Sequence, residues 1–331
     1  MTTPPNPVGV GFIGAGDISI LHAKAVDRCP GAKLVGLWNR SPQRAEERAA
    51  EFGCRRFETA AALIDDPDVD AVFVLTNLET HLEYARLALL AKKPVLVEKP
   101  VAASVAELLE MKQLAEEVQV PCMPGHNYIY EESLRRSAEL IAEGELGRLV
   151  SVYVMYNIHH PEEVAKRYPG VVRQILTHHS YILRFLAGRV RRVSAMKAVL
   201  HYEEYTEEDI AMATLELENG ALAHFCASFA ADDHAADPWT VVVKAIGTAG
   251  STRYSYRDWV EIKPGLVHSQ TYTAYQGSIT SEVRHFVDVC IRGNGAPLST
   301  LDDAIDAQRL IEAIEVSVAE RRVVDLGTTA N

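Results

Sequence analysis

The stretch that decides the fold lies near the start of the chain, where residues 8–19 read VGVGFIGAGDIS. Its first half, Val8–Ile13, is almost wholly apolar, as expected of a strand covered on both faces of a parallel sheet. A helical pattern follows a short turn made of Gly14, Ala15, Gly16, Asp17, Ile18 and Ser19. The turn matches G-x-G-x-x-G/A except that Ser19 takes the third small position. Strand, glycine turn and helix together predict a dinucleotide site, where glycines let the backbone approach a pyrophosphate at a helix N-terminus.

The same alternation continues through the first third of the chain. Further apolar runs occupy residues 34–38, 71–75 and 95–97, and helical patterns separate them. Start signals precede these helices at Ser41-Pro42, at Thr80-x-x-Glu83 and at Ser104-x-x-Glu107. Repeated strand–helix units predict an α/β domain with a doubly wound parallel sheet.

Beyond about residue 128 the pattern changes. Apolar and polar residues alternate over 150–157, and Asn219-Gly220 separates two strand-like runs at 210–218 and 221–229, which is a strong hairpin signal. A further strand at 241–246 and a final helix from Thr300 complete the pattern. We therefore predict two domains, a nucleotide-binding domain at 1–128 and an α+β domain at 129–331 with a large, mostly antiparallel open sheet.

Composition narrows the classes of function. The chain has 331 residues, 48% of them hydrophobic, and a formal net charge of −12, so a nucleic-acid partner is not expected. Its five cysteines form no C-x-x-C pair, and no stretch approaches the ~20 apolar residues of a membrane span. We expect a soluble cytoplasmic protein with no membrane contact and no metal, since adjacent histidines such as His159-His160 usually point to different faces.

The choice of cofactor depends on the end of the second strand. An acidic residue about 20 positions after the glycine turn usually binds the adenosine ribose of NAD. Here that position holds the neutral Asn39, and Arg40 beside it can meet a 2′-phosphate. We expect NADP or NAD, with these two residues favouring NADP.

Several ordered motifs resemble one known family. Thr76-Asn77 with His81, then Glu98-Lys99-Pro100, and then His126-Asn127-Tyr128 follow the glycine turn. Together they are similar to the glucose–fructose oxidoreductase, inositol dehydrogenase and rhizopine-catabolism proteins (the Gfo/Idh/MocA family). The resemblance implies a Rossmann domain, a C-terminal domain with an open sheet, and homodimers or homotetramers built on that sheet.

The resemblance also implies roles for individual residues. The residues expected at the nicotinamide end of the cofactor are Thr76, Asn77, His81, Glu98, Lys99 and Asn127. Tyr128 follows them directly and is a candidate substrate contact.

Lys99 is the first candidate catalytic residue. A lysine that follows a buried strand in a parallel sheet points into the crevice where ligands sit, and partial burial lowers its pKa. It can then take the proton of a substrate hydroxyl, or return it to a ketone, while a hydride moves to or from nicotinamide. The resemblance places this role on Lys99 as well.

The second candidate is His178. In the resembled family an aspartate precedes a catalytic histidine by four residues on one helix, which puts both on the same face. The matching positions here are Gln174 and His178, and a later acidic position holds Tyr181. Gln174 can bind a hydroxyl but cannot transfer a proton. We expect Gln174 to orient the substrate.

We thus predict an NAD(P)-dependent dehydrogenase or reductase acting on a secondary hydroxyl of a sugar, sugar derivative or cyclitol. Two alternatives remain open. One is a glycoside-cleaving enzyme that oxidises its substrate only transiently, and the other is a non-catalytic, cofactor-sensing regulator.

Overall fold

The computed structural model describes residues 6–229, 239–255 and 269–327. The chain forms two compact units, one of residues 1–130 with 276–305 and one of residues 131–275 with 306–331. The first change of unit falls after Tyr130, close to the single boundary predicted between 128 and 129. The return of residues 276–305 to the first unit was not anticipated, because the sequence there carries no pattern that separates it from the second unit.

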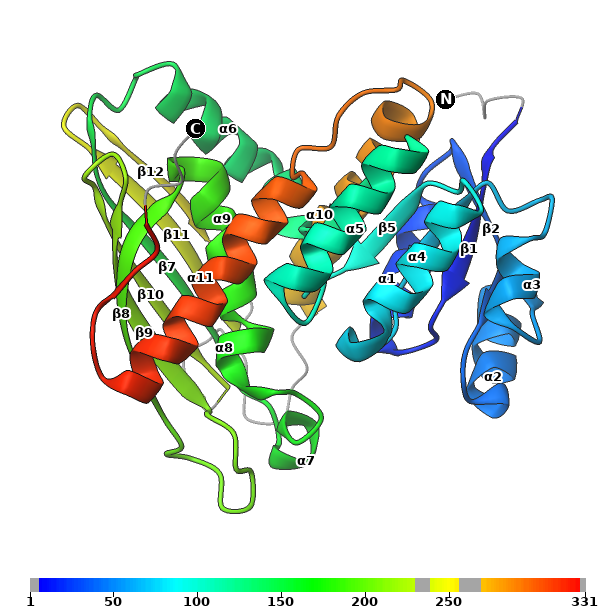
Figure 1. Ribbon diagram of the computed structural model, residues 1–331, viewed down its shortest axis with the longest axis horizontal. Helices are drawn as coiled ribbons and strands as arrows, with labels where there is room; N and C mark the ends of the chain where they lie inside the picture. The colour runs from blue at the N-terminus through cyan, green and yellow to red at the C-terminus, as the bar shows by residue number, and fades with distance from the viewer. Residues whose placement is uncertain (1–5, 230–238, 256–268, 328–331) are drawn as a thin grey trace. The chain divides into compact units, whose positions relative to one another are not determined.

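The first unit is built on a six-stranded sheet, with helices α1, α4 and α5 running beside its strands in Figure 1. Every neighbouring pair of strands is parallel, which confirms the predicted Rossmann-type sheet. In sheet order the strands are β3 (Arg55–Arg56), β2 (Ala32–Trp38), β1 (Val8–Ile13), β4 (Ala71–Val74), β5 (Val95–Glu98) and β6 (Cys122–Gly125). The helical segments are α1 (Asp17–Asp27), α2 (Pro42–Phe52), α3 (Ala60–Ile64), η1 (Leu78–Thr80), α4 (His81–Leu90), α5 (Val105–Val118), η2 (Asn127–Tyr130), most of α10 (Ser269–His285), η3 (Phe286–Ile291) and the start of α11 (Leu301–Glu320).

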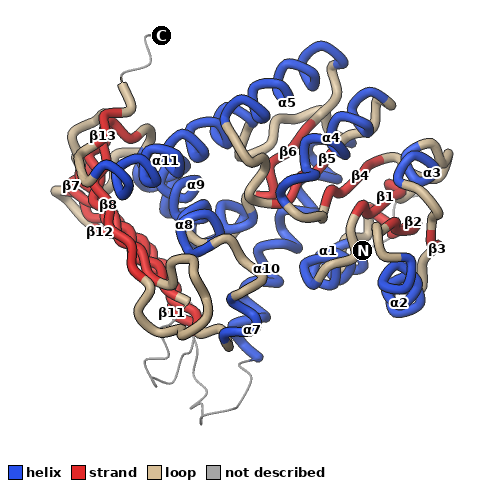
Figure 2. The backbone as a smooth tube through the Cα atoms, turned by 60° about the horizontal axis from the view of Figure 1, so that its bottom comes forward, coloured by secondary structure: helices blue, strands red, loops and turns tan. Residues whose placement is uncertain are grey.

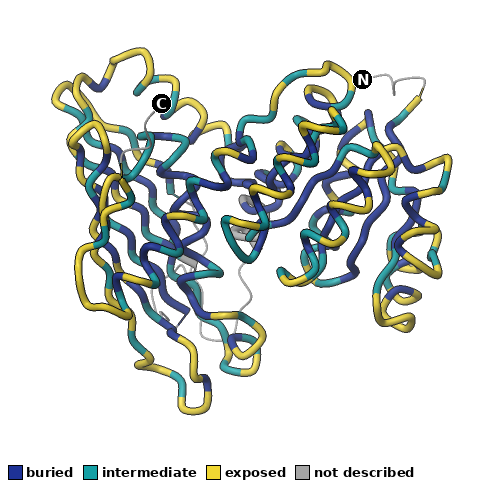
Figure 3. The backbone as a smooth tube through the Cα atoms, viewed as in Figure 1, coloured by how far each residue is buried: buried dark blue, intermediate teal, exposed yellow. Residues whose placement is uncertain are grey.

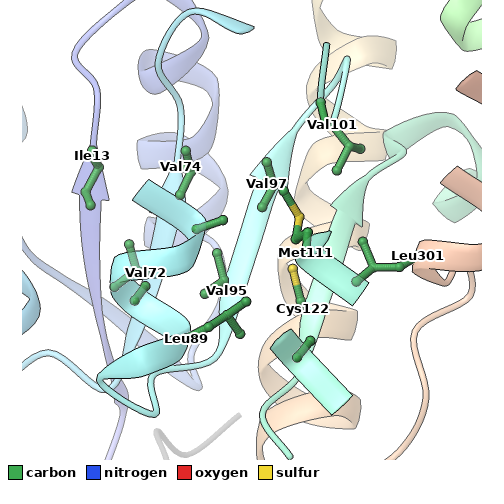
Figure 4. Close-up of a cluster of buried hydrophobic side chains, with 14 of the residues drawn as sticks. Ile13, Val72, Val74, Leu89, Val95, Val97, Val101, Met111, Cys122 and Leu301 are labelled. Carbon is green, nitrogen blue, oxygen red and sulfur yellow. The ribbon is translucent and has the colours of Figure 1, made fainter. Parts of the chain in front are cut away.

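Alternate residues of the central strands face two different cores. Ile13, Val72 and Val97 join side chains of α3, α4 and α5 in the cluster drawn in Figure 4. On the opposite face the rings of Phe12 and Phe73 stack with centroids 5.4 Å apart. Both faces are covered, so the strands are buried along most of their length (Figure 3) and read as continuous apolar runs.

Local start and stop signals explain where several helices begin and end. The side chain of Ser41 accepts a hydrogen bond from the N–H of Arg44 at the start of α2, and Gly53 ends that helix at φ 65°. Ser104 caps α5 in the predicted way. Thr80 does not cap α4, because its hydroxyl instead donates to the carbonyl oxygen of Asn77 and to Thr76. The helix start predicted at Thr80 is therefore right, but the side-chain hydrogen bond expected to cap it is not made.

The second unit is built on a seven-stranded sheet. All neighbouring pairs are antiparallel except β7 with β10, so the predicted mostly antiparallel sheet is confirmed. The hairpin at Asn219-Gly220 joins β9 to β10, with Gly220 at φ 84°. In sheet order the strands are β12 (Ser251–Ser255), β11 (Trp239–Gly247), β7 (Leu149–Ile158), β10 (Leu222–Ser228), β9 (Ile210–Leu217), β8 (Val190–Ala198) and β13 (Val324–Asp325).

Helices of the second unit pack along one face of this sheet, as Figure 2 shows for α8, α9 and the second half of α11. The helices are α6 (Glu132–Ala142), α7 (Glu162–Ala165), α8 (Gly170–Gln174), α9 (Leu176–Ala187) and α11 from residue 306 onward. In the described part of the chain, no helix has the length and apolar character needed to cross a membrane.

Candidate functional site

The glycine turn after β1 has the geometry that a dinucleotide requires. Gly14 has φ 115°, and a Cβ there would lie 2.4 Å from the carbonyl oxygen of Leu75, so only glycine fits. A Cβ on Gly16 would meet nothing within 4 Å, and no side chain caps the start of α1. An open backbone beside an uncapped helix N-terminus fits the pyrophosphate of a dinucleotide.

The residues around this turn differ in their exposure to solvent. Ala15 is buried and Ile18 half-buried, whereas Asp17 is exposed and pairs with Arg44 and Arg48 at 3.6 Å each. Ser19, at the imperfect third position, is buried, and its hydroxyl donates to the carbonyl oxygen of Gly16 at 2.6 Å. The serine therefore closes the first turn of α1 in place of a third glycine.

Asn39 connects the end of β2 to the glycine turn. Its Oδ1 accepts from the N–H of Ala15 at 3.1 Å, and its Nδ2 donates to the carbonyl oxygen of Ser41 at 3.2 Å. Arg40 beside it is exposed. A neutral amide and an exposed guanidinium thus stand at the place where the adenosine ribose binds in this type of fold.

The loop after β4 holds three predicted residues. Thr76 is half-buried, Asn77 is exposed and His81 is buried at the start of α4. The ring of His81 bridges two loops, with Nδ1 2.8 Å from the carbonyl oxygen of Pro100 and Nε2 3.0 Å from that of Thr76. Burial lowers the pKa of His81, and these hydrogen bonds only partly offset the effect. His81 therefore joins the loop after β4 to the one after β5.

Glu98 is the last residue of β5, and Lys99 follows it directly. Because Val95 and Val97 belong to the core on one face of the sheet, the alternation of a strand directs Glu98 to the other face. Glu98 is buried, and its carboxylate accepts from the backbone N–H of Lys99. The Lys99 side chain is half-buried, and desolvation lowers its pKa although the charge of Glu98 opposes the shift. A lysine with a lowered pKa gives up its proton more readily than an exposed lysine, as a general base requires.

Two buried residues near Glu98 were missed by the sequence analysis. His22 on α1 is fully buried, with Nε2 3.5 Å from Oε1 of Glu98, and its ring meets Phe12 and Phe73 edge-on. Glu282 on α10 is 1% exposed, and its pKa is raised well above the ordinary range by burial and then by the charge of Glu98. His22 could have been noticed as a histidine on the apolar face of α1, whereas no sequence signal places Glu282 near Glu98.

The segment after β6 is entirely buried. Asn127 donates from Nδ2 to the hydroxyl of Ser278 at 2.7 Å, and Nδ1 of His126 lies 2.7 Å from the hydroxyl of Ser299. Tyr128 has no exposed side-chain surface. Tyr128 is thus packed inside the first unit, directly after Asn127.

In the second unit His178 lies in the first turn of α9 and is 1% exposed. Its Nδ1 is 2.7 Å from the hydroxyl of Tyr181, one helical turn later. The rings of Tyr156 and Tyr275 also flank it, with centroids 5.8 and 6.5 Å away. The neighbouring His179 faces Phe225 instead, and burial lowers its pKa to about 3. The structure thus places His178 in a group of tyrosines.

Gln174 and His178 do not share one continuous helix, contrary to the expected spacing. Gln174 is the last residue of α8, Ile175 has φ −108° and ψ −45°, and α9 starts at Leu176. Only this one residue separates the two helices, and the hydroxyl of Thr177 still donates to the carbonyl oxygen of Arg173 across it. Gln174 is half-buried, and Lys99 and His178 belong to different units. Within the described residues no three metal-ligating side chains gather in a way that could hold an ion.

Comparison with known proteins gives matches over most of the chain. A family model described as the GFO_IDH_MocA oxidoreductase family with an NAD-binding Rossmann fold matches residues 8–126. A second model, the GFO/IDH/MocA C-terminal domain, matches residues 134–253. Together these two models match well over half of the chain.

Individual relatives agree with the family models. A D-apiose dehydrogenase of Paraburkholderia graminis is 25% identical over 95% of this chain and 88% of that protein. The scyllo-inositol 2-dehydrogenase (NAD(+)) of Bacillus subtilis is 27% identical over 88% of each. The crystal structure of GenD2 from gentamicin A biosynthesis, solved in complex with NAD, superposes with a TM-score of 0.87 at 24% identity, covering 99% of this chain and 98% of that one. This structural likeness shows that the fold is shared.

Proposed function

The chain belongs to the GFO/IDH/MocA family of oxidoreductases with an NAD-binding Rossmann fold, and we propose that it transfers a hydride between NAD(P) and a secondary hydroxyl or ketone of a sugar, sugar derivative or cyclitol. The observation that carries the proposal is the lysine at the end of β5. Lys99 is half-buried, and desolvation lowers its pKa. It follows β5, which belongs to the same parallel sheet as β1, the strand that precedes the glycine turn. The dehydrogenase names of the relatives support the class of substrate.

The first unit supplies the cofactor site in this proposal. Gly14, Ala15, Gly16, Asp17 and Ile18 take the pyrophosphate at the start of α1, which Gly14 and the uncapped helix end fit. The nicotinamide end is held by Thr76, Asn77, His81, Glu98 and Asn127. When bound, the nicotinamide ring supplies the hydride donor or acceptor.

In this proposal Lys99 and His178 exchange protons with the substrate, and Gln174 orients it. In the oxidative direction the neutral amine of Lys99 takes the hydroxyl proton of the substrate, and in the reductive direction its ammonium returns one to the carbonyl oxygen. His178 shares this acid/base work, and Gln174 holds a hydroxyl of the substrate by hydrogen bonds. Desolvation lowers the pKa of Lys99, which makes its neutral amine more accessible than that of an exposed lysine.

We propose that NADP is bound at least as well as NAD. Asn39 carries no charge that would repel a 2′-phosphate, and Arg40 is exposed beside it. An acidic residue at position 39 would instead accept hydrogen bonds from the ribose hydroxyls of NAD.

We also propose a homodimer or homotetramer formed through the open face of the second sheet. Met155, Cys226, Met212 and Met196 are successive cross-strand partners on this face. Met196 is 79% and Met212 44% exposed, an apolar band that a second copy would cover. The five cysteines are all free, which fits the reducing cytoplasmic location that we propose.

The experiment that tests the proposed function is nicotinamide absorbance during incubation with a panel of sugars, sugar acids and cyclitols, with NAD and NADP in parallel. Reduction of either cofactor with one class of substrate establishes the dehydrogenase and identifies the cofactor.

The absence of any reduction, with cofactor binding verified by titration, would contradict the proposed function. Cofactor that copurifies with the protein would then favour a glycoside-cleaving enzyme with transient oxidation, and exchangeable cofactor a sensing regulator. Gln174 in place of an aspartate is the observation that keeps both alternatives in view.

A further inference from the structure

The short helix α8 carries Gln174 at its last position, and its amino end is held by a distant part of the chain. Gly170 begins the helix, and Val171 and Val172 follow it. All three residues are buried, and Pro169 before them offers no side-chain acceptor. The first N–H groups of a helix have no partner within the helix, so buried ones need acceptors from elsewhere. These acceptors therefore decide where α8 starts.

The loop that precedes β9 supplies all three acceptors. The N–H of Gly170 donates to the hydroxyl of Tyr205 at 2.9 Å. The N–H of Val171 donates to the backbone carbonyl oxygen of Glu208 at 3.2 Å, and that of Val172 donates to Oε1 of the same glutamate at 3.0 Å. Two residues that are distant in sequence thus fix the amino end of α8.

Glu208 is suited to this role because it is buried and its charge is paired. Its side chain is 3% exposed, and its Oε2 accepts from Nζ of Lys197 on β8 at 2.7 Å. A carboxylate forms a stronger hydrogen bond than a neutral acceptor and also meets the partial positive charge of a helix amino end. Gly170 has φ 87°, and a Cβ there would lie 2.3 Å from Oε1 of Glu208. The close approach of the carboxylate therefore requires the glycine.

Tyr205 provides the second anchor. It is buried, and its hydroxyl donates to the carbonyl oxygen of Tyr168 at 3.0 Å while it accepts from Gly170. Burial raises the pKa of Tyr205 to about 12, so the hydroxyl keeps the proton that it donates at neutral pH. One phenol thus holds the backbone on both sides of the turn into α8.

The other end of the segment is held separately. Arg173 directly precedes Gln174 and forms two hydrogen bonds to the carboxylate of Glu315 on α11, at 2.6 and 3.2 Å. All these residues belong to the second unit. Because both ends of α8 are held, the place of the Gln174 side chain depends on the anchors.

We propose that Glu208 is a positioning residue, assisted by Tyr205 and Lys197, which fixes the start of α8 and thereby the place of the Gln174 amide at the substrate. Glu208 acts through Gln174 and touches neither substrate nor cofactor. This inference rests on the proposed function, in which Gln174 holds a hydroxyl of the substrate, and it extends that function to residues that no sequence motif marks.

Steady-state kinetics with the substrate identified in the panel test the proposal. In Glu208→Ala the buried N–H of Val172 loses its acceptor, so we expect the KM of the substrate to rise roughly tenfold. The Kd of the cofactor, which the proposed function places in the first unit, should not change. Glu208→Gln keeps an oxygen for Val172 and should restore most of the affinity. Glu207→Ala, at the exposed position next to it, is the matched control and should behave as wild type.

A double-mutant cycle separates positioning from a general loss of stability. If Glu208 acts through Gln174, then Glu208→Ala should add little to the KM of a Gln174→Ala variant. Effects on KM that multiply would overturn the proposal, and so would an unchanged KM in folded Glu208→Ala. If Glu208→Ala does not fold, Tyr205→Phe takes its place in the same cycle. It loses only the hydroxyl and should raise KM roughly fivefold, again without adding to Gln174→Ala.

Amide hydrogen exchange of the whole protein tests the anchoring without any substrate. Glu208→Ala should speed exchange over residues 170–174 roughly tenfold and leave the strands of the first unit unchanged. An unchanged rate over 170–174 would overturn the proposal. If the wild-type protein turns over no substrate, the proposed function fails and the positioning of a substrate fails with it, whereas faster exchange in the variant would still show the anchor. The two failures are therefore distinguishable.

Discussion

The N–H of Ala15 in the glycine turn donates to Oδ1 of Asn39 at the end of the neighbouring strand, over 3.1 Å. One side chain thus joins the expected pyrophosphate and ribose ends of the cofactor site. Removing it in Asn39→Ala should weaken NAD and NADP alike by roughly fivefold, since one neutral hydrogen bond is worth about 1 kcal/mol. Titration of each cofactor into the apoprotein measures both constants.

In the same titration, Arg40 should affect the affinity for NADP and not that for NAD. Arg40→Ala should raise the Kd of NADP at least about tenfold and leave that of NAD unchanged, because a charge-assisted hydrogen bond to the 2′-phosphate contributes roughly 1.5–3 kcal/mol. The control is Lys33→Ala, which removes an exposed cation from β2. Equal effects of Arg40→Ala on both cofactors would contradict the proposed preference.

We expect His22 to fix the position of the Glu98 carboxylate, which the proposed function places at the nicotinamide end of the cofactor. The two side chains approach to 3.5 Å inside the first unit, and His22 is packed by the rings of Phe12 and Phe73. His22→Leu removes the polar neighbour and should raise the Kd of the cofactor roughly tenfold, the equivalent of about 1.4 kcal/mol. The surface substitution His201→Gln should have no effect, and an unchanged Kd in folded His22→Leu would show that Glu98 needs no such partner.

The buried carboxyl of Glu282 should make stability depend on pH in one particular direction. Its pKa in the folded protein is raised well above the ordinary 4.5 by burial. Above pH 4.5 the unfolded chain releases this proton while the folded protein keeps it, so the contribution is fully present below pH 4.5 and is lost as the pH rises toward the folded pKa.

Glu282→Gln, a neutral side chain of the same shape, removes this dependence. Urea unfolding should show a larger free energy of unfolding for the variant than for wild type at about pH 8, and a smaller difference at about pH 5. Glu145→Gln on the surface serves as the control. A variant that is less stable than wild type at both pH values would mean that the carboxylate is ionised and paired.

His179 should make stability depend on pH in the direction opposite to that expected for Glu282. It is fully buried, and burial lowers its pKa from 6.5 to about 3. Between these values the unfolded chain binds a proton that the folded protein does not, so stability is lost as the pH falls below 6.5. By pH 4 the loss is roughly 3 kcal/mol. His179→Phe, packed against Phe225, should flatten the acid limb of a urea-unfolding series, and an unaltered limb would refute the assignment.

Much of the fold follows from local sequence signals. The run Val8–Ile13 is buried on both faces of its sheet, and that environment is what its unbroken apolar pattern predicts. Ser41 and Gly53 bound a helix through hydrogen bonds made within a few residues. Such features depend on neighbours in the chain, and the sequence shows those neighbours.

The rest depends on contacts between distant segments. The interruption at Ile175 lies between α8 and α9, which both pack on the sheet, and no glycine or proline marks it. Glu282 comes near Glu98 only because residues 276–305 return to the first unit. Motifs in the sequence therefore predict candidate site residues, but they do not predict which distant side chains folding brings beside them.

The most direct test of the central claim compares three proteins in a rapid-mixing experiment: wild type, Lys99→Met and the exposed control Lys33→Met. Each is loaded with cofactor and mixed with the substrate identified in the panel, and nicotinamide absorbance is followed. We predict that all three bind the cofactor equally, that wild type and Lys33→Met transfer hydride at the same rate, and that Lys99→Met is slower by about a hundredfold or more. Hydride transfer at the wild-type rate in Lys99→Met would contradict the account.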